Sequence, residues 1–362
     1  MLNLGRLKHL ANVLGVWESD ILRVLVGLEE NPSAFVTELT VWPAKKEKRS
    51  RDVISPRRRW RLIQQRIYKR LLLRELQPTP YIHGGVRGRN AASNARTHIG
   101  NVFGFVTDIT DFFPSIDCHR VNELFLRHGS GYQMAKVLTR LCTYEFHLAQ
   151  GLTTSSILAN EIFKSADLHI ARACNEMELR YSRYVDDIAV SGKYDLKRSG
   201  VKAVIQDVVE RFGFKLNLAV GKTDWGRLDC DISITGARVT GNHLNPSRDF
   251  VSELQRLIRD HQSLAADGHF DGPFLVEGEL VGKAYHACYL NSGLRRSILS
   301  ELGKIKWDAV MNYATRRNLC RRIERIAPRG EPRPSAEIPL ALSQGWQNTV
   351  LQPTDPNLVP WE

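Results

Sequence analysis

Apolar residues recur at helical spacing along much of the chain, and this pattern predicts several helices. Two short ones are expected within the first forty residues. A longer helix is expected to open at Pro56, because a proline at the first helical position sacrifices no hydrogen bond, with Trp60, Ile63 and Ile67 on its buried face. From about 250 to 326 the pattern is helical again.

Shorter apolar runs predict strands between these helices. One strand is expected at Phe103–Val106, running into Asp108. The segment 180–192 has apolar residues on both sides of an acidic turn, which predicts a β-hairpin. A helix capped by Thr154 or Ser155 is expected between them, and another covers 200–212. Strands and helices together indicate an α+β fold.

Composition places the chain among folded proteins without a membrane span. Of its 362 residues, 43% are hydrophobic and 25% are charged, which excludes wholesale disorder. There is no apolar run of about eighteen residues, and the N-terminus has scattered charges and no small-residue cleavage site. Six cysteines without a CxxC pair favour reduced thiols over a zinc site. We therefore expect a cytoplasmic protein.

The charge balance raises nucleic acid as a partner. The formal net charge is +12, and thirteen Lys or Arg residues against two acids lie between Lys45 and Arg74. A second basic stretch near the C-terminus contains Arg321 and Arg322. Such segments can bind phosphates, although a basic surface that only keeps a protein soluble has the same composition.

Three carboxylates carry the candidate chemistry. Asp108 ends a strand, and Asp186 and Asp187 occupy the tip of the predicted hairpin. Carboxylates brought together in this way can hold two Mg²⁺ ions, because Mg²⁺ prefers oxygen ligands. An isolated Asp-Asp pair is usually a solvated turn, but within an apolar hairpin it needs a cation to offset the cost of burial. Asp186 is the residue we expect to bridge the ions.

These segments resemble reverse transcriptases. Tyr184–Asp187 (YVDD) is similar to their catalytic palm motif, and Asp108 with Phe112 and Phe113 is similar to their first acidic motif. The segment 149–160 (AQGLTTSSILAN) resembles the loop beneath the incoming nucleotide. The three segments occur in the order of the family, and the likeness covers roughly residues 40–300.

The resemblance implies a role for each matching residue. Asp108, Asp186, Asp187 and the Ile109 carbonyl would hold two Mg²⁺ ions, and Lys222 would protonate the leaving pyrophosphate. Phe113 would exclude a 2′-hydroxyl, although a core phenylalanine is the alternative. Gln150 and Gly151 would lie along the nucleotide and template, and Lys45, Lys46 and Arg51 would hold the triphosphate of a dNTP.

Two further elements resemble the bacterial retron group. Asn94 and His98 lie in SNARTH, which is similar to an Asn-Ala-x-x-His element, and ITG with Thr235 and Gly236 is similar to a Val-Thr-Gly element. These four residues, with Arg321 and Arg322, would contact RNA. The resemblance implies a structured noncoding RNA as template and primer, a branched RNA–DNA product started from a 2′-hydroxyl, and an antiphage role with an effector or toxin protein. A host ribonuclease H would remove the RNA.

Some residues depart from the family pattern, and other functions stay open. Thr153 and Ser156 stand where prolines are usual, and Val185 stands where many retron enzymes have alanine. A group II intron-like or other defence reverse transcriptase would lack the branched product. A non-catalytic RNA-binding scaffold that restrains a toxin is the alternative outside enzymes, although the three intact acids argue against it.

The expected fold is a right-hand polymerase, with fingers, a palm of antiparallel strands backed by helices, and a helical thumb. The expected division is an N-terminal helical segment at 1–40, fingers at 41–100 and 118–149, palm at 101–117 and 150–240, thumb at 241–327, and a Pro-rich tail at 328–362.

Overall fold

The computed structural model describes residues 4–41, 51–219, 221–267 and 275–310. The chain forms two compact units. The first comprises Met1–Val251 and Tyr289–Ser292, and the second comprises Ser252–Cys288 and Gly293–Glu362. Both helices and strands are present, as expected for an α+β fold. The expected division into fingers, palm and thumb stays a prediction.

The first unit begins with the two short helices expected from the leucine pattern. They are α1 (Leu7–Leu14) and α2 (Glu18–Glu30), and their apolar stripes are buried. A 3₁₀ turn (Pro32–Phe35) leads into a hairpin of β1 (Val36–Val41) and β2 (Arg51–Pro56), whose antiparallel register pairs the first residue of β1 with the last of β2.

The next helix starts later than predicted. Pro56 is the last residue of β2, and α3 (Arg58–Ile67) has Arg57 as its N-cap. Proline has no backbone N–H to donate, so it can also stand at the end of an edge strand. The predicted buried face is confirmed, because Trp60 is fully buried and its indole Nε1 donates to the Leu141 carbonyl at 2.8 Å. A π-helical turn (Tyr68–Leu72) and α4 (Leu73–Glu75) follow.

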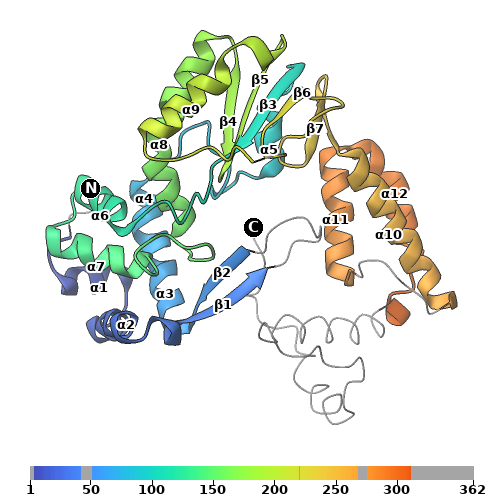
Figure 1. Ribbon diagram of the computed structural model, residues 1–362. Coiled ribbons are helices and arrows are strands. Elements are labelled where there is room, and N and C mark those ends of the chain that lie inside the picture. The colour runs from blue at the N-terminus through green and yellow to red at the C-terminus, as the bar shows by residue number, and fades with distance from the viewer. Residues whose placement is uncertain (1–3, 42–50, 220, 268–274, 311–362) are drawn as a thin grey trace. The chain divides into compact units, whose positions relative to one another are not determined.

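The first unit contains a four-stranded antiparallel sheet (Figure 1). Its order is β4-β5-β3-β6, where β4 is Arg180–Tyr184, β5 is Asp187–Gly192, β3 is Phe103–Asp108 and β6 is Asp224–Arg227. The predicted hairpin over 180–192 is therefore confirmed as β4 and β5.

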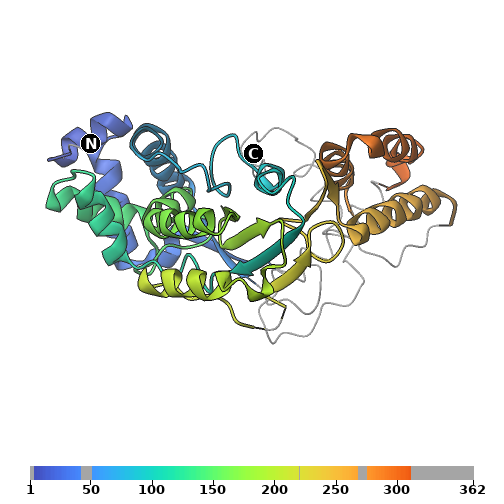
Figure 2. The same cartoon turned by 90° about the horizontal axis from the view of Figure 1, so that it is seen from above.

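Alternation along the strands gives the sheet two different faces. On one face, side chains such as Phe105, Ile188 and Val190 join the main core under α8 (Ser155–Glu176) and α9 (Val201–Arg211). Figures 1 and 2 show these two helices beside the sheet. Thr154 is the N-cap residue of α8, as predicted, but its side chain makes no capping hydrogen bond. The Ser155 hydroxyl donates to the Ala149 carbonyl.

Two smaller elements cover part of the other face. They are α5 (Ala91–Arg96) and a hairpin of β7 (Ala237–Thr240) and β8 (His243–Pro246). Ala92 and Ala95 of α5 pack in a second apolar cluster with Ala189 of β5. The small side chains of these three alanines let the helix approach the strands.

The remaining helices support these elements. In the first unit, α6 (Cys118–Arg127) and α7 (Tyr132–Cys142) pack against each other, and α7 also contacts α2 and α3. In the second unit, apolar residues are buried along α10 (Arg248–Asp267), α11 (Glu277–Leu290) and α12 (Arg295–Leu302). Within the described residues, each helix is too short or too polar to cross a membrane.

Trp60 offers a test of the packing between α3 and α7. The Leu141 carbonyl also accepts a hydrogen bond from the Gln64 amide at 3.0 Å. Trp60→Phe therefore keeps a ring and leaves that carbonyl paired, and we expect a loss of about 1–2 kcal/mol in the free energy of unfolding. Trp60→Ala leaves a cavity and should cost about 3–5 kcal/mol.

Urea denaturation followed by circular dichroism measures both losses. The exposed Trp17 serves as a control, because Trp17→Ala should change stability by less than about 0.5 kcal/mol. Equal losses for the two Trp60 variants would show that the indole donor, rather than the packed ring, dominates this contact.

Candidate active site

Asp108 lies directly across the sheet from the acidic hairpin. The register of β3 and β5 pairs Asp108 with Asp187, so their side chains leave the same face of the sheet. Asp186 occupies the turn between β4 and β5, and its carbonyl accepts a hydrogen bond from the Ile109 amide at 3.0 Å. Residues almost eighty positions apart in sequence thus meet at one end of the sheet.

Lys222 approaches Asp108 from the opposite side. The pairing of β3 with β6 ends at Val106 and Asp224, and extending it by two residues places Lys222 beside Asp108. The hydroxyls of Thr107 and Thr223 lie 3.0 Å apart, consistent with this register. Lys222 Nζ donates to Asp108 Oδ2 at 2.9 Å. Asp108 is therefore flanked by an acid on one strand and a cation on the other.

The backbone around Asp108 is held by a neighbouring segment. Asn217 donates its amide to the Asp108 carbonyl at 2.8 Å, and its side-chain Nδ2 lies 3.3 Å from Asp108 Oδ2. Thr110 donates to the Lys215 carbonyl at 2.8 Å. Asp108 is only 8% exposed, and the contacts of Asn217 hold both its backbone and its carboxylate.

The oxygen donors fit a hard divalent cation only in part. Among the described residues, Asp108 Oδ1 is buried without a hydrogen-bond partner, as expected of an oxygen that a ligand completes. The carboxylates of Asp186 and Asp187 extend the set of oxygen ligands. However, within the described part of the chain, no three His, Cys, Asp or Glu side chains are grouped closely enough to hold a metal ion, and Lys222 occupies Oδ2.

The loop that contains Gln150 and Gly151 packs on the β1–β2 hairpin. The Ile54 amide donates to the Gln150 carbonyl at 2.8 Å. Gly151 has a φ of +98°, and a Cβ there would lie 2.3 Å from the Ile54 carbonyl oxygen. Glycine is therefore required where the loop meets β2. This contact joins the expected nucleotide loop to the expected fingers.

Phe112 and Phe113 both contribute to the main core. Their ring centroids are 5.6 Å apart, and Phe112 also packs edge-on against Phe163 at 5.7 Å. The expected burial of Phe112 is confirmed. Phe113 is 8% exposed, so little of its ring faces solvent, and exclusion of a 2′-hydroxyl by Phe113 stays a prediction.

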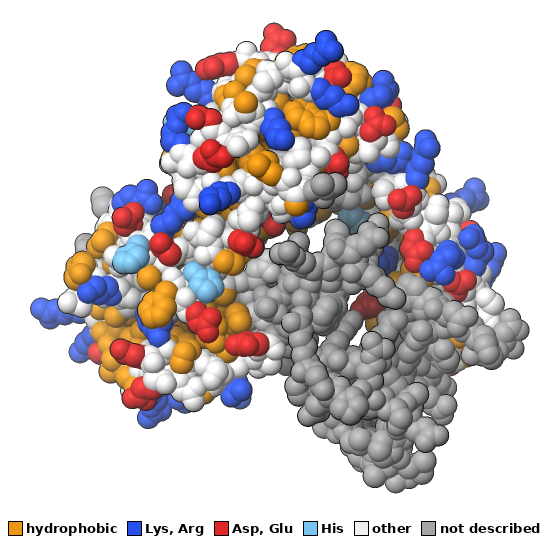
Figure 3. All heavy atoms as spheres, viewed as in Figure 1, with side chains coloured by type: hydrophobic (Ala, Val, Ile, Leu, Met, Phe, Trp, Pro, Cys, Tyr) orange, Lys and Arg blue, Asp and Glu red, His pale blue; other side chains and the backbone are white. Residues whose placement is uncertain are grey.

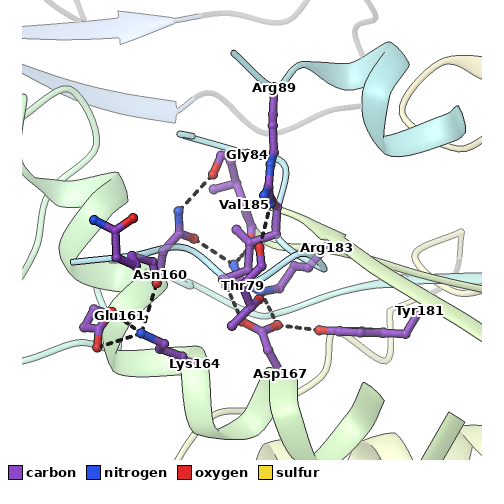
Figure 4. A network of polar contacts seen from close by, with 12 residues as sticks. Thr79, Gly84, Arg89, Asn160, Glu161, Lys164, Asp167, Tyr181, Arg183 and Val185 are labelled. Atoms are coloured by element: carbon purple, nitrogen blue, oxygen red, sulfur yellow. Dashed lines mark hydrogen bonds and ion pairs between the residues drawn. The ribbon is translucent and has the colours of Figure 1, made fainter. Parts of the chain in front are cut away.

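Sequence reasoning missed a buried network behind the acidic turn (Figure 4). Arg183 precedes Tyr184 on β4 and pairs with Asp167 of α8, and both are fully buried. Two signals in the sequence could have found it. Alternation in the hairpin places Arg183 on the opposite face from Tyr184, and Asp167 lies between the buried positions Phe163 and Ile170 of one helix face. Two buried residues of opposite charge need each other.

Comparison with known proteins finds several similar reverse transcriptases. No family model matches the chain. The retron Mx65 reverse transcriptase of Myxococcus xanthus is 30% identical over 240 residues, which cover 60% of this chain and 55% of that protein. The retron Ec86 reverse transcriptase of Escherichia coli is 31% identical over 214 residues, covering 59% of this chain and 65% of that protein.

A third relative, the retron Se72 reverse transcriptase of Salmonella heidelberg, is 28% identical over 211 residues, covering 55% of each chain. The chain is similar to these three retron reverse transcriptases over more than half of its length. It spans less than two thirds of the length of each of these three relatives.

The ITG turn packs against α5, the helix that contains Asn94, although the two lie far apart in sequence. The Thr235 hydroxyl, in the ITG turn before β7, donates to the Ala91 carbonyl at the start of α5, at 2.8 Å. Thr235 and Gly236 both have positive φ, 46° and 82°. Ala95 and Ile234, one from each retron-like element, belong to one apolar cluster with Ala189, on the sheet face that carries Asp108.

The placement of Asn94 and His98 corrects the expected RNA contacts. Both side chains are fully buried. The His98 ring lies between β4 and β5, with Nδ1 2.6 Å from Ser191 Oγ and Nε2 2.8 Å from Ser182 Oγ. A ring with both nitrogens occupied inside the protein does not reach a nucleic acid in this structure. Its role here is to join α5 to the sheet.

Other predicted site residues cannot be placed. Lys45, Lys46, Arg321 and Arg322 lie outside the described residues, as does the Pro-rich tail. Arg51 is described only by its backbone at the start of β2. On the face shown in Figure 3, Lys and Arg side chains are scattered among Asp and Glu over the described surface. Binding of RNA by these basic residues stays a prediction.

Burial of His98 makes the stability of the protein depend on pH. Burial lowers the pKa of His98 to about 3, with smaller contributions from the charges of His83 and Arg180. The unfolded chain takes up a proton near pH 6.5, so the stabilisation is complete above that pH and is lost as pH falls toward 3. Between pH 7.0 and 5.5, His98 alone should remove about 1.3 kcal/mol from the free energy of unfolding.

Urea denaturation of wild type and His98→Gln at both pH values measures this contribution. The loss between pH 7.0 and 5.5 should be smaller in His98→Gln by about 1.3 kcal/mol. Burial also lowers the pKa of His83, to about 4, so His83→Gln should reduce the loss in the same direction. An unchanged pH dependence in His98→Gln would contradict the buried, neutral ring.

Proposed function

We propose that the chain catalyses RNA-templated DNA synthesis, adding deoxynucleotides to a primer at the end of the sheet that carries Asp108, Asp186 and Asp187. The observation that carries this proposal is the register that pairs Asp108 with Asp187. Its second support is the similarity to three retron reverse transcriptases. The chain spans less than two thirds of the length of each of these relatives.

Asp108, Asp186, Asp187 and the Ile109 carbonyl would hold two Mg²⁺ ions. When bound, such ions make a primer hydroxyl more acidic and offset the charge that develops on the leaving pyrophosphate. Lys222 supplies a positive charge beside Asp108 in the structure. In the proposed reaction Lys222 leaves Asp108 and gives a proton to the pyrophosphate.

The nucleotide would be held by residues from two parts of the first unit. Lys46 and Arg51 belong to the basic segment around β1 and β2, and would bind the triphosphate. Gln150 and Gly151 pack directly on β2, which supports a shared nucleotide site. Phe113 follows Asp108 by five residues and would face the sugar. In this arrangement β2 belongs to the fingers and the four-stranded sheet belongs to the palm.

The retron assignment adds a specific template and product. A structured noncoding RNA would act as template and primer, and synthesis from an internal 2′-hydroxyl would leave a branched RNA–DNA molecule. The contact between Thr235 and Ala91 supports this assignment, because it joins the ITG turn to α5, the helix that contains Asn94. The effector protein, the antiphage role and RNA removal by a host ribonuclease H stay predictions.

Primer extension tests the proposed activity. Purified protein with Mg²⁺, dNTPs and a primed RNA should extend the primer, and Asp186→Asn should slow extension by about 100-fold or more, because one charged ligand is lost. Asp207→Asn is the matched control, since Asp207 is an exposed residue of α9 paired with Arg211. It should extend the primer at the wild-type rate.

Two outcomes would decide against parts of the proposal. Equal extension by wild type and Asp186→Asn would exclude the acidic turn as the active site, and no extension by wild type would favour a non-catalytic scaffold. Sequencing across the junction of co-purified nucleic acid separates the retron assignment from an intron-like enzyme, because only the retron product contains a 2′–5′ linkage.

A further inference from the structure

The buried guanidinium of Arg183 anchors the backbone of the turn next to Asp186 and Asp187. Arg183 Nη1 donates to the Val185 carbonyl at 2.5 Å. The same nitrogen lies 3.2 Å from Asn160 Oδ1. Nε and Nη2 donate to the two oxygens of Asp167 at 2.8 and 2.7 Å. One planar group therefore connects helix α8 to the backbone of the acidic turn (Figure 4).

The network around Arg183 is fully buried and closely paired. Arg183 and Asp167 are both 0% exposed. Tyr181 donates its hydroxyl to Asp167 Oδ1 at 2.6 Å, and the guanidinium lies 4.7 Å from the ring centroid of Phe163. Burial alone would lower the pKa of Arg183, but the Asp167 carboxylate outweighs that effect and the pKa is raised. Arg183 is thus a permanent cation inside the protein.

A strained backbone needs such an anchor. Val185 has a φ of +59°, a conformation that costs a β-branched residue considerable energy and persists only where the surroundings enforce it. Its carbonyl is the group that Arg183 holds. The strain and the hydrogen bond therefore occur at the same residue, immediately before Asp186.

The segment that contains Tyr81, His83 and Gly84 contacts the other side of the turn. The His83 amide donates to the Arg183 carbonyl at 2.8 Å, and the Arg183 amide donates to the Tyr81 carbonyl at 2.9 Å. A Cβ on Gly84 would lie 2.3 Å from the Val185 nitrogen. The Gly84 carbonyl in turn accepts from Asn160 Nδ2 at 2.9 Å. Asn160 therefore contacts both Arg183 and Gly84.

We infer that Arg183, oriented by Asp167 and Asn160, is a positioning residue that holds the Val185 carbonyl and thereby sets the direction in which Asp186 and Asp187 leave the turn. The inference rests on the proposed function for its kinetic consequence only. Its structural consequence, a rigid turn, does not depend on which reaction the acids serve.

Arg183→Lys is the most informative variant. A lysine keeps a positive charge beside Asp167, but its single ammonium lacks the planar fork that reaches the carboxylate and the Val185 carbonyl together. Arg183→Met with Asp167→Asn is the second variant, because it removes both charges and leaves an oxygen for the Tyr181 hydroxyl. The matched control is Arg172→Met with Glu176→Gln, which removes an exposed ion pair on α8, the helix that contains Asp167.

Hydrogen exchange measures the position of the turn without any reaction. The Ile109 amide donates to the Asp186 carbonyl, so it reports on the turn directly. We expect exchange at Ile109 and Asp187 to become at least about 10-fold faster in both Arg183 variants, with unchanged exchange in α9 and in the control. Wild-type exchange at Ile109 in Arg183→Lys and in the charge-free pair would overturn the inference.

Primer extension supplies the second readout. Misplaced acids should lower kcat by about 100-fold, while KM for dNTPs changes by less than about threefold, because the residues that would hold the triphosphate are untouched. A wild-type kcat in both variants would overturn the inference. If the wild-type protein itself does not extend a primer, the proposed function fails, and the exchange result still decides whether Arg183 positions the turn.

Discussion

The candidate site depends on one antiparallel pairing, that of β3 with β5. Because the register places Asp108 opposite Asp187, the two carboxylates share a sheet face at a distance that only backbone hydrogen bonds set. A shift of one residue would turn one of them to the opposite face. That opposite face is filled by Phe105, Ile188 and Val190 under α8 and α9, so the core enforces the register on which the acids depend.

The two faces of the sheet carry different kinds of side chain. One face holds the apolar core and the buried pair of Arg183 and Asp167. The other holds the acids, Lys222 and the small cluster with α5 and the ITG turn. In the retron-like elements, His98 and Thr235 form hydrogen bonds to other groups of the protein. In this structure these contacts join α5 to the sheet and to the ITG turn.

Local patterns in the sequence predicted the elements well. The leucine stripes located α1 and α2, and the apolar runs around the acidic turn located β4 and β5. The predicted start of a helix was wrong at Pro56, because proline can either open a helix or end a strand, and here it ends β2. The burial of His98 and the pairing of Arg183 with Asp167 depend on contacts between distant segments. Spacing within one segment could not reveal them.

Binding of a divalent cation by the RNA-free protein tests the central claim most directly. Titration with Mn²⁺, which replaces Mg²⁺ and is detected by electron paramagnetic resonance, should show bound ions in the wild-type protein. Asp108→Asn with Asp187→Asn should abolish that binding, because both oxygen donors of the paired strands lose their charge. Mn²⁺ binding that is identical in the wild type and in this double variant would contradict a metal site built on the pairing of β3 with β5.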